Sequence, residues 1–250
     1  MSYQQYRPNS FSLLPVVVKN LLIINGLFFL TTEVVKGQFN IDLSDNLGLH
    51  YFTSENFRPW QLVSYMFMHG SIMHIFFNMF ALWMFGNTLE NLWGSKRFLI
   101  YYMVTGIGAG LIQLLVTHFR LMNLYSQISP ESLDHILTQG TEILQEGKNF
   151  ADPIAGEING LINSVTIGAS GAVFGILLAF GMLFPNTMLY IYFAIPIKAK
   201  WFVVLYGAVE LISGIANSAN DNVAHFAHLG GMLFGFILIK IWQKRNNHFY

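Results

Sequence analysis

Residues 167–184 read IGASGAVFGILLAFGMLF, an apolar stretch without a charge that is followed directly by Pro185. A helix needs about 20 apolar residues to cross the hydrocarbon core of a bilayer, and this stretch is close to that length. Its single hydroxyl lies near the start, at Ser170, among glycine and alanine residues. The stretch therefore predicts a short membrane helix that carries a serine near one end.

Apolar stretches of the same kind lie on both sides of this one. Of the 250 residues, 54% are hydrophobic and 10% are charged, against about 25% charged residues in an ordinary soluble domain. Five further spans are predicted, at about 12–34, 66–89, 98–118, 201–219 and 223–241. We therefore expect an all-α membrane protein, a bundle of six transmembrane helices that forms a single domain over residues 1–250. The first stretch lacks the charged start and cleavage site of a signal peptide, so it is expected to be retained as a span.

The distribution of basic residues predicts the orientation of the bundle. If the N-terminus is cytoplasmic, only Lys36, Arg58, Arg120 and Lys148 of the 13 lysines and arginines fall in outer segments, which leaves nine in cytoplasmic ones. Cytoplasmic loops are the ones enriched in these residues. We therefore expect both termini in the cytoplasm.

Two connections have features of their own. Residues 119–163 form an acidic outer insert, in which Ser129-Pro130-Glu131 is typical of a helix start and predicts a surface helix at about 130–146. The insert is either a solvated addition or a surface for a partner. Residues 186–195, between two prolines, are too short to span and are predicted to connect spans four and five at the interface.

Four polar side chains are expected at a similar depth near the outer surface. His74, Asn78, Ser170 and His228 all fall one or two turns below the outer end of their predicted spans, because spans two, four and six enter from the same side. A serine hydroxyl is a poor nucleophile until a base takes its proton, and an imidazole with an ordinary pKa of about 6.5 is suited to that task. Each of these residues also has a structural interpretation. The glycines after Ser170 are also typical of close packing between membrane helices, and His228 could simply be a histidine at the water-exposed end of a helix.

Two glycine-containing motifs surround the serine and the histidine. The run GASG at 168–171 matches G-x-S-G, and the run AHLGGMLFG at 227–235 matches A-H-x-x-G-x-x-x-G. Both patterns belong to the rhomboid family of intramembrane serine proteases, which this chain resembles.

Two more motifs extend the resemblance to the second span. The run HGSIMHIFFN at 69–78 contains the family's H-x-x-x-N, and Gly86 with Glu90 matches the G-x-x-x-E that closes the same helix. The four motifs occur in family order over roughly residues 10–243. This order implies the six-helix rhomboid core.

The resemblance implies a role for each matched residue. Ser170 would be the nucleophile and His228 the general base, while His74, Asn78 and Gly168 would surround the oxyanion or substrate. The supporting positions would be Gly171, Phe174, Gly231, Gly235 and Glu90. Phe174 stands where some members have a tyrosine against the imidazole. The family's dyad has no acid, so no third member is assigned.

Other polar residues could serve other chemistry. His225 with His69 and His74 suggests a metal site, but no carboxylate or thiolate joins them at ligand spacing, so no metal is expected. Glu210 lies in the middle of span five, where it is either a proton or ion relay or, as we favour, a hydrogen-bonded acid that faces other helices. Asn217 and Asn220 are expected to help water reach the site.

The predicted function is that of an intramembrane serine endopeptidase, which hydrolyses bonds in or near transmembrane segments of other membrane proteins through a Ser-His dyad. The first alternative is a silent rhomboid-like protein that binds or escorts membrane helices, and the second, from Glu210, is a transporter. Net charge is zero and there is no cysteine, which gives no support to a nucleic-acid partner and excludes thiol catalysis. No cofactor is expected. The predicted partners are transmembrane substrates and the lipid bilayer of a bacterial inner membrane, and the oligomeric state stays open.

Overall fold

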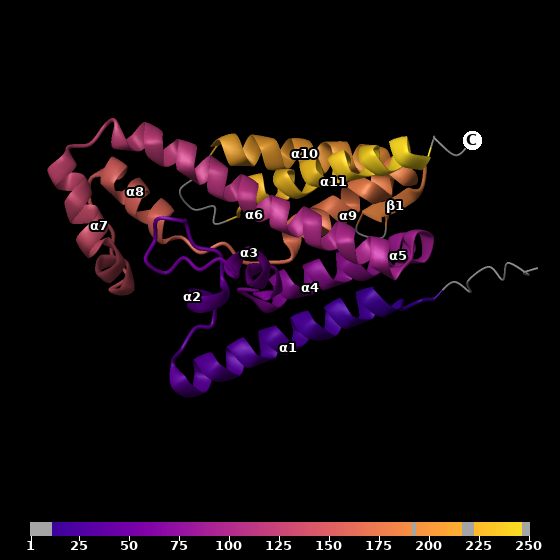
Figure 1. Cartoon of the computed structure of the whole chain (residues 1–250), viewed down its shortest axis with the longest axis horizontal. Helices are drawn as coiled ribbons and strands as arrows, with labels where there is room; N and C mark the ends of the chain where they lie inside the picture. Colours follow the sequence, from indigo (N-terminus) through magenta and orange to yellow (C-terminus); the bar gives the residue numbers. More distant parts are fainter. Residues whose placement is uncertain (1–11, 192–193, 217–222, 247–250) are drawn as a thin grey trace, which may run out of the picture.

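The computed structural model describes residues 12–191, 194–216 and 223–246. Its long helices run roughly along one axis, with α6, α9 and α11 between α1 on one side and α10 on the other (Figure 1). The spanning elements are α1 (Val16–Phe39), α4 (Ile72–Ala81) continued by η2 (Leu82–Gly86) and α5 (Asn87–Trp93), α6 (Ser95–Tyr125), α9 (Ser170–Leu183), α10 (Ala199–Ala216) and α11 (His225–Asn246). The predicted all-α membrane bundle is confirmed, and the six predicted spans correspond to these six segments.

Within the described residues, five helices are long and apolar enough to cross a membrane, and α9 is shorter. The outer spans expose large apolar side chains: Leu27 on α1 is 58% exposed and Ile212 on α10 is 67% exposed. A continuous apolar surface of this kind is unfavourable in water and suits contact with lipid. The chain is therefore an integral membrane protein.

The helix α9 lies at the centre because its small residues let neighbours approach. A Cβ added at Gly175 would come within 2.7 Å of the Cβ of Thr105 on α6, and one added at Gly231 on α11 would collide with the backbone of Gly171. These glycines form the contacts between α9, α6 and α11. Most of α9 is buried, which suits a helix surrounded by others rather than by lipid.

The second span begins and ends later than predicted. It begins at Ile72 rather than near 66, because Ser71 ends the preceding turn and its side chain accepts a hydrogen bond from the N–H of His74 at 3.1 Å. The π-helical turn η2 interrupts it, a feature that the hydrophobic pattern does not contain.

Glu90 in α5 ties the first span to the second. Its carboxylate accepts hydrogen bonds from the N–H groups of Val17 at 2.9 Å and Val18 at 2.8 Å, and from the hydroxyl of Ser95. The first N–H groups of a helix lack partners within the helix, and the helix dipole favours a negative charge there. Glu90 therefore caps α1 from a neighbouring span.

The loop before the second span and the insert lie at one end of the bundle (Figure 1). The loop contains the short helices α2 (Ser44–Leu47) and α3 (Gln61–Ser64), followed by the 3-10 turn η1 (Tyr65–Phe67). The insert folds into α7 (Pro130–Gln145), as predicted, with the Ser129 side chain accepting from the N–H of Ser132. A second helix, α8 (Pro153–Asn163), was not predicted, although Asp152-Pro153 gives it the same kind of start.

The connection between the fourth and fifth spans is a hairpin. Strand β1 (Met188–Ile191) pairs antiparallel with β2 (Ile195–Lys198), with Met188 opposite Lys198. The predicted short connection is therefore present, and it takes the form of two strands. The hairpin lies at the opposite end of the bundle from α7 and α8 (Figure 1).

Candidate active site

Ser170 is the first residue of α9, and the glycine two positions before it shapes the turn. Gly168 has a φ of +125°, a conformation that side chains rarely adopt, and its N–H donates to the carbonyl of Tyr65 at 2.9 Å. A Cβ at Gly168 would lie 2.7 Å from Nε2 of His74. The backbone before Ser170 thus passes directly beside the His74 ring, with no room for a side chain.

His228 in α11 lies opposite Ser170. Its Nε2 is 2.8 Å from the Ser170 Oγ, and the residue is 8% exposed. This distance falls within the range for proton transfer between a nucleophile and its base. Two residues 58 positions apart thus meet because α9 and α11 touch through Gly171 and Gly231.

An aromatic stack holds one face of the imidazole. The ring of Phe174 lies parallel to the ring of His228, with centroids 4.2 Å apart and an interplanar angle of 5°. Tyr206 of α10 stacks on the other face of Phe174 at 5.2 Å. Phe174 therefore restricts rotation of the imidazole by packing alone, since it has no hydroxyl to donate.

The other imidazole nitrogen contacts an acid that the sequence reasoning left out of the site. Nδ1 of His228 is 2.8 Å from Oε2 of Glu210, and Nδ1 of His225 is 2.6 Å from the same oxygen. Glu210 is thus a hydrogen-bonded acid facing another helix, the reading favoured from the sequence. Of the three histidines weighed as metal ligands, His225 is the one that this carboxylate contacts; spacing along the chain does not reveal the contact, because Glu210 lies on another helix.

Glu210, His225 and His228 bring donor atoms within 4.8 Å of one another. Two imidazoles and a carboxylate form a set that zinc also uses. In the structure the three groups are joined directly by hydrogen bonds. The absence of a metal therefore stays a prediction.

The second span contributes His74 and Asn78, but in different ways. His74 lies beside the Gly168 turn, close to Ser170. The Asn78 side chain donates to the carbonyl of His74 at 2.9 Å, within its own helix. Asn78 is thus buried near the site, with its amide engaged by the backbone of α4 in this state.

His69 supports His74 from the turn before α4. The two rings meet edge to face with centroids 4.9 Å apart, and His69 is 2% exposed. Burial, with the His74 ring as a second cause, lowers the pKa of His69 to about 4. His69 is therefore a neutral packing partner at neutral pH. Asn217 and Asn220 lie outside the described residues.

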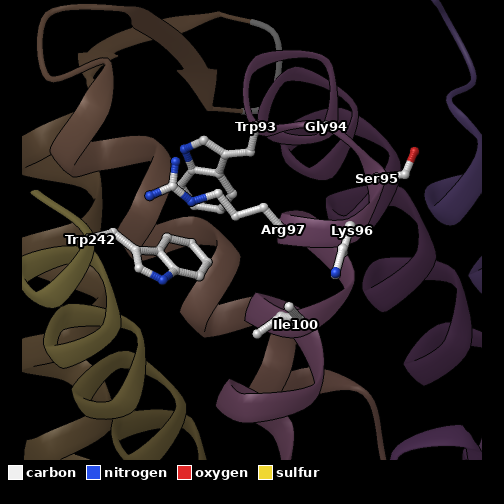
Figure 2. A pocket seen from close by; sticks show the side chains of 7 residues that line it. All are labelled: Trp93, Gly94, Ser95, Lys96, Arg97, Ile100 and Trp242. Carbon is white, nitrogen blue, oxygen red and sulfur yellow. The ribbon is translucent and has the colours of Figure 1, made fainter. Parts of the chain in front are cut away.

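A pocket of about 430 Å³ lies away from this site, where α5, α6 and α11 meet (Figure 2). Trp93 and Trp242 line it, and the guanidinium of Arg97 lies 4.2 Å from the Trp242 ring centroid. Tryptophan and basic residues together are typical of the membrane–water interface. This end of the bundle therefore has the character of a membrane boundary, and it is separate from Ser170.

Comparison with known proteins matches the same region of the chain. A model of the rhomboid domain matches residues 56–245. RHOMBOID-like protein 12, mitochondrial, of Arabidopsis thaliana is 26% identical over 86% of this chain and 55% of its own length. The uncharacterized rhomboid protein P4H10.10, mitochondrial, of Schizosaccharomyces pombe is 28% identical over 76% of this chain and 53% of its own length.

A bacterial relative is also similar. YdcA of Bacillus subtilis, whose name describes a candidate rhomboid protease, is 27% identical over 72% of this chain and 65% of its own length. The chain spans about half the length of the plant and yeast relatives.

Proposed function

The chain belongs to the rhomboid family, and we propose that it is an intramembrane serine endopeptidase that cuts transmembrane proteins through Ser170 and His228. The family acts on membrane-protein substrates in a bilayer. The observation that carries the proposal is the 2.8 Å approach of the Ser170 Oγ to Nε2 of His228, from two separate spans.

The proposed reaction begins with proton transfer. His228 takes the proton of Ser170 as the oxygen attacks the scissile carbonyl carbon, which gives a tetrahedral intermediate with a negative oxygen. His228 then gives this proton to the leaving amine, and the C–N bond breaks to leave an acyl-enzyme. A water molecule, deprotonated by His228, attacks the acyl carbon and releases Ser170.

The negative oxygen needs donors that are fixed before the reaction. In our proposal these are the N–H of Ser170 at the start of α9 and the ring of His74, which lies beside the Gly168 turn. The positive end of the α9 dipole adds to them. Asn78 would join them after exchanging its bond to the His74 carbonyl for one to the oxyanion.

The membrane location shapes the substrate. Backbone groups in a spanning helix are hydrogen-bonded within the helix, so a scissile bond must first be unwound. We propose that substrates are transmembrane segments with small or helix-breaking residues, cut near one end. Ser170, His74 and His228 all lie near the start of their helices, which supports a site near one membrane surface.

We retain the orientation with both termini in the cytoplasm as part of the proposal. In Figure 1, α1 begins and α11 ends at the same end of the bundle, as an even number of spans requires. The expected bacterial inner membrane finds no support in the relatives, because two of those described above are mitochondrial.

The proposal is tested with a panel of tagged single-span proteins in liposomes. Wild-type protein should cleave at least one of them, and Ser170→Ala and His228→Ala should abolish cleavage while thermal unfolding stays close to that of the wild type. Cleavage that persists in either variant would remove the dyad. A folded wild type that binds the panel without cleaving it would favour the silent, helix-binding alternative.

A further inference from the structure

The acid beside the catalytic histidine has a geometry that the two-residue mechanism does not use. Glu210 is 6% exposed on α10, and its Oε2 lies on the far side of the His228 ring from Ser170. Ser170, His228 and Glu210 form a continuous chain with both links at 2.8 Å. We propose that Glu210 is a positioning residue of this site, which fixes the tautomer of His228 and stabilises the imidazolium formed during catalysis.

The tautomer follows from what each atom can donate. An ionised carboxylate only accepts hydrogen bonds, so Nδ1 of His228 must carry the proton that joins it to Glu210. A neutral imidazole has one N–H, and Nε2 is therefore left as the acceptor. The hydroxyl of Ser170 then donates to Nε2, which is the arrangement that a general base needs. Without the carboxylate, the proton can move to Nε2 and block that role.

The same carboxylate also responds to the charge that develops. When His228 takes the serine proton, both of its nitrogens carry N–H groups and the ring becomes positive. A positive ring is costly in a buried site, and an opposite charge at hydrogen-bond distance lowers that cost. Glu210 is 2.8 Å from Nδ1 in the resting state, so no rearrangement is required during the reaction.

His225 holds the carboxylate in place. Its Nδ1 lies 2.6 Å from the same oxygen, one helical turn before His228 on α11. A buried ionised carboxylate is expensive unless it is paired and hydrogen-bonded, and two imidazole N–H groups satisfy Oε2. Replacement of His225 is thus expected to lower kcat less than replacement of Glu210, because His225 acts on His228 only through the carboxylate.

Within the described residues, further polar groups near this chain lie on α6, on α4 and on α10 itself. Arg120 of α6 donates to the carbonyl of Gly214 at 2.7 Å, about one turn beyond Glu210 on α10. His74 of α4 lies on the Ser170 side, and Tyr206 lies one turn before Glu210 on α10. None of these three residues is a carboxylate, and the carboxylate that contacts His228 is that of Glu210.

The test compares Glu210→Gln and Glu210→Asp with the wild type, using cleavage of a single-span substrate in liposomes with EDTA present. Because this inference rests on the proposed function, Ser170→Ala is run beside them. Glutamine is similar in size to glutamate, but it presents a neutral amide to Nδ1 of His228 in place of the carboxylate. In soluble serine proteases the equivalent change lowers kcat about 10⁴-fold through the wrong tautomer, and we expect about 10²–10⁴-fold here.

The predicted pattern separates positioning from structural support. Glu210→Gln should lower kcat with KM and thermal unfolding unchanged, and should shift the pH profile of kcat. Glu210→Asp should restore part of the loss, and His225→Gln should lower kcat less. Leu211→Ala, a lipid-facing neighbour on α10 that is 46% exposed, should match the wild type. A Glu210→Gln enzyme with wild-type kcat and pH profile would overturn the inference, as would equal losses in Gln and Asp variants.

A second readout does not depend on activity. In protein with ¹⁵N-labelled histidine, His228 should carry its proton on Nδ1 in the wild type and in Ser170→Ala, and should lose this preference in Glu210→Gln. If Ser170→Ala still cleaves substrate while the tautomer depends on Glu210, the proposed dyad fails and the positioning role stands. If the tautomer is the same with and without the carboxylate, the positioning role fails. If Glu210→Gln does not fold, Glu210→Asp and His225→Gln replace it: each should weaken the Nδ1 preference and lower kcat in part, and an unchanged tautomer and kcat in both would overturn the positioning role.

Discussion

Replacing Gly231 by alanine should separate the two helices that carry the site. An added Cβ would lie 2.7 Å from the carbonyl carbon of Gly171 and closer still to its oxygen. Carbon atoms in contact normally stay about 3.5–4.0 Å apart, so α9 and α11 must move apart by about 1 Å. Both partners are backbone atoms of helices, and neither can turn aside as a side chain would.

This movement acts directly on the reacting pair. The Ser170 Oγ and Nε2 of His228 are 2.8 Å apart, and an opening of about 1 Å would take them beyond hydrogen-bond reach. A misplacement of this size costs about 10²-fold in rate. Overpacking should also lower stability by about 1–3 kcal/mol.

The assay is steady-state cleavage of a single-span substrate, with thermal unfolding measured in the same detergent. The matched control is Gly26→Ala on α1, where an added Cβ meets nothing within 4 Å. We expect Gly231→Ala to lose kcat while it stays folded, and Gly26→Ala to keep the wild-type kcat. Wild-type kcat in Gly231→Ala would refute the claim that this glycine contact sets the distance between the catalytic groups.

Three further changes probe the surroundings of the site. His74→Ala should lower kcat by about 10²–10³-fold with little change in KM, as the loss of one oxyanion donor does; equal effects on both constants would point to substrate binding instead. Phe174→Tyr should keep the stack on His228 and most of the activity, while Phe174→Ala should lose about 3–5 kcal/mol of unfolding free energy as well as kcat; an inactive but stable Phe174→Tyr would argue against packing as its role. Glu90→Ala should lower the unfolding temperature, because buried charge-assisted hydrogen bonds contribute about 1.5–3 kcal/mol each, whereas the exposed Glu33→Ala should not; equal unfolding temperatures would show that the α1 cap is dispensable.

Much of the fold follows from hydrophobic length and from small residues. The six spans were predictable because a bilayer demands long apolar helices. Charge bias and helix rise predicted a similar depth for Ser170 and His228, and the resemblance to the rhomboid family paired them. The helix at Pro130 was predictable from its cap. The helix at Pro153 was not predicted, although the sequence has the same signal there. The Asp152 side chain caps this helix by accepting a hydrogen bond from the N–H of Ala155 at 2.8 Å.

The partner of Glu210 could not be predicted, because the register between two helices is set by packing and is not visible in either helix alone. A Cβ at Gly214 would lie 3.0 Å from the ring of Phe226, and one at Gly207 would lie 3.2 Å from Met232. These contacts fix α10 against α11 and bring Glu210 opposite His225 and His228. The direction of the Asn78 side chain could not be predicted either. Its amide donates a hydrogen bond to the backbone carbonyl of His74, and a sequence motif does not show which partner a side chain takes.

The most direct measurement is to map the adduct of a fluorophosphonate probe by mass spectrometry on the folded protein in liposomes. Our account predicts one modified residue, Ser170, with modification lost in His228→Ala. An adduct on a different residue, or full modification of Ser170 without His228, would contradict it.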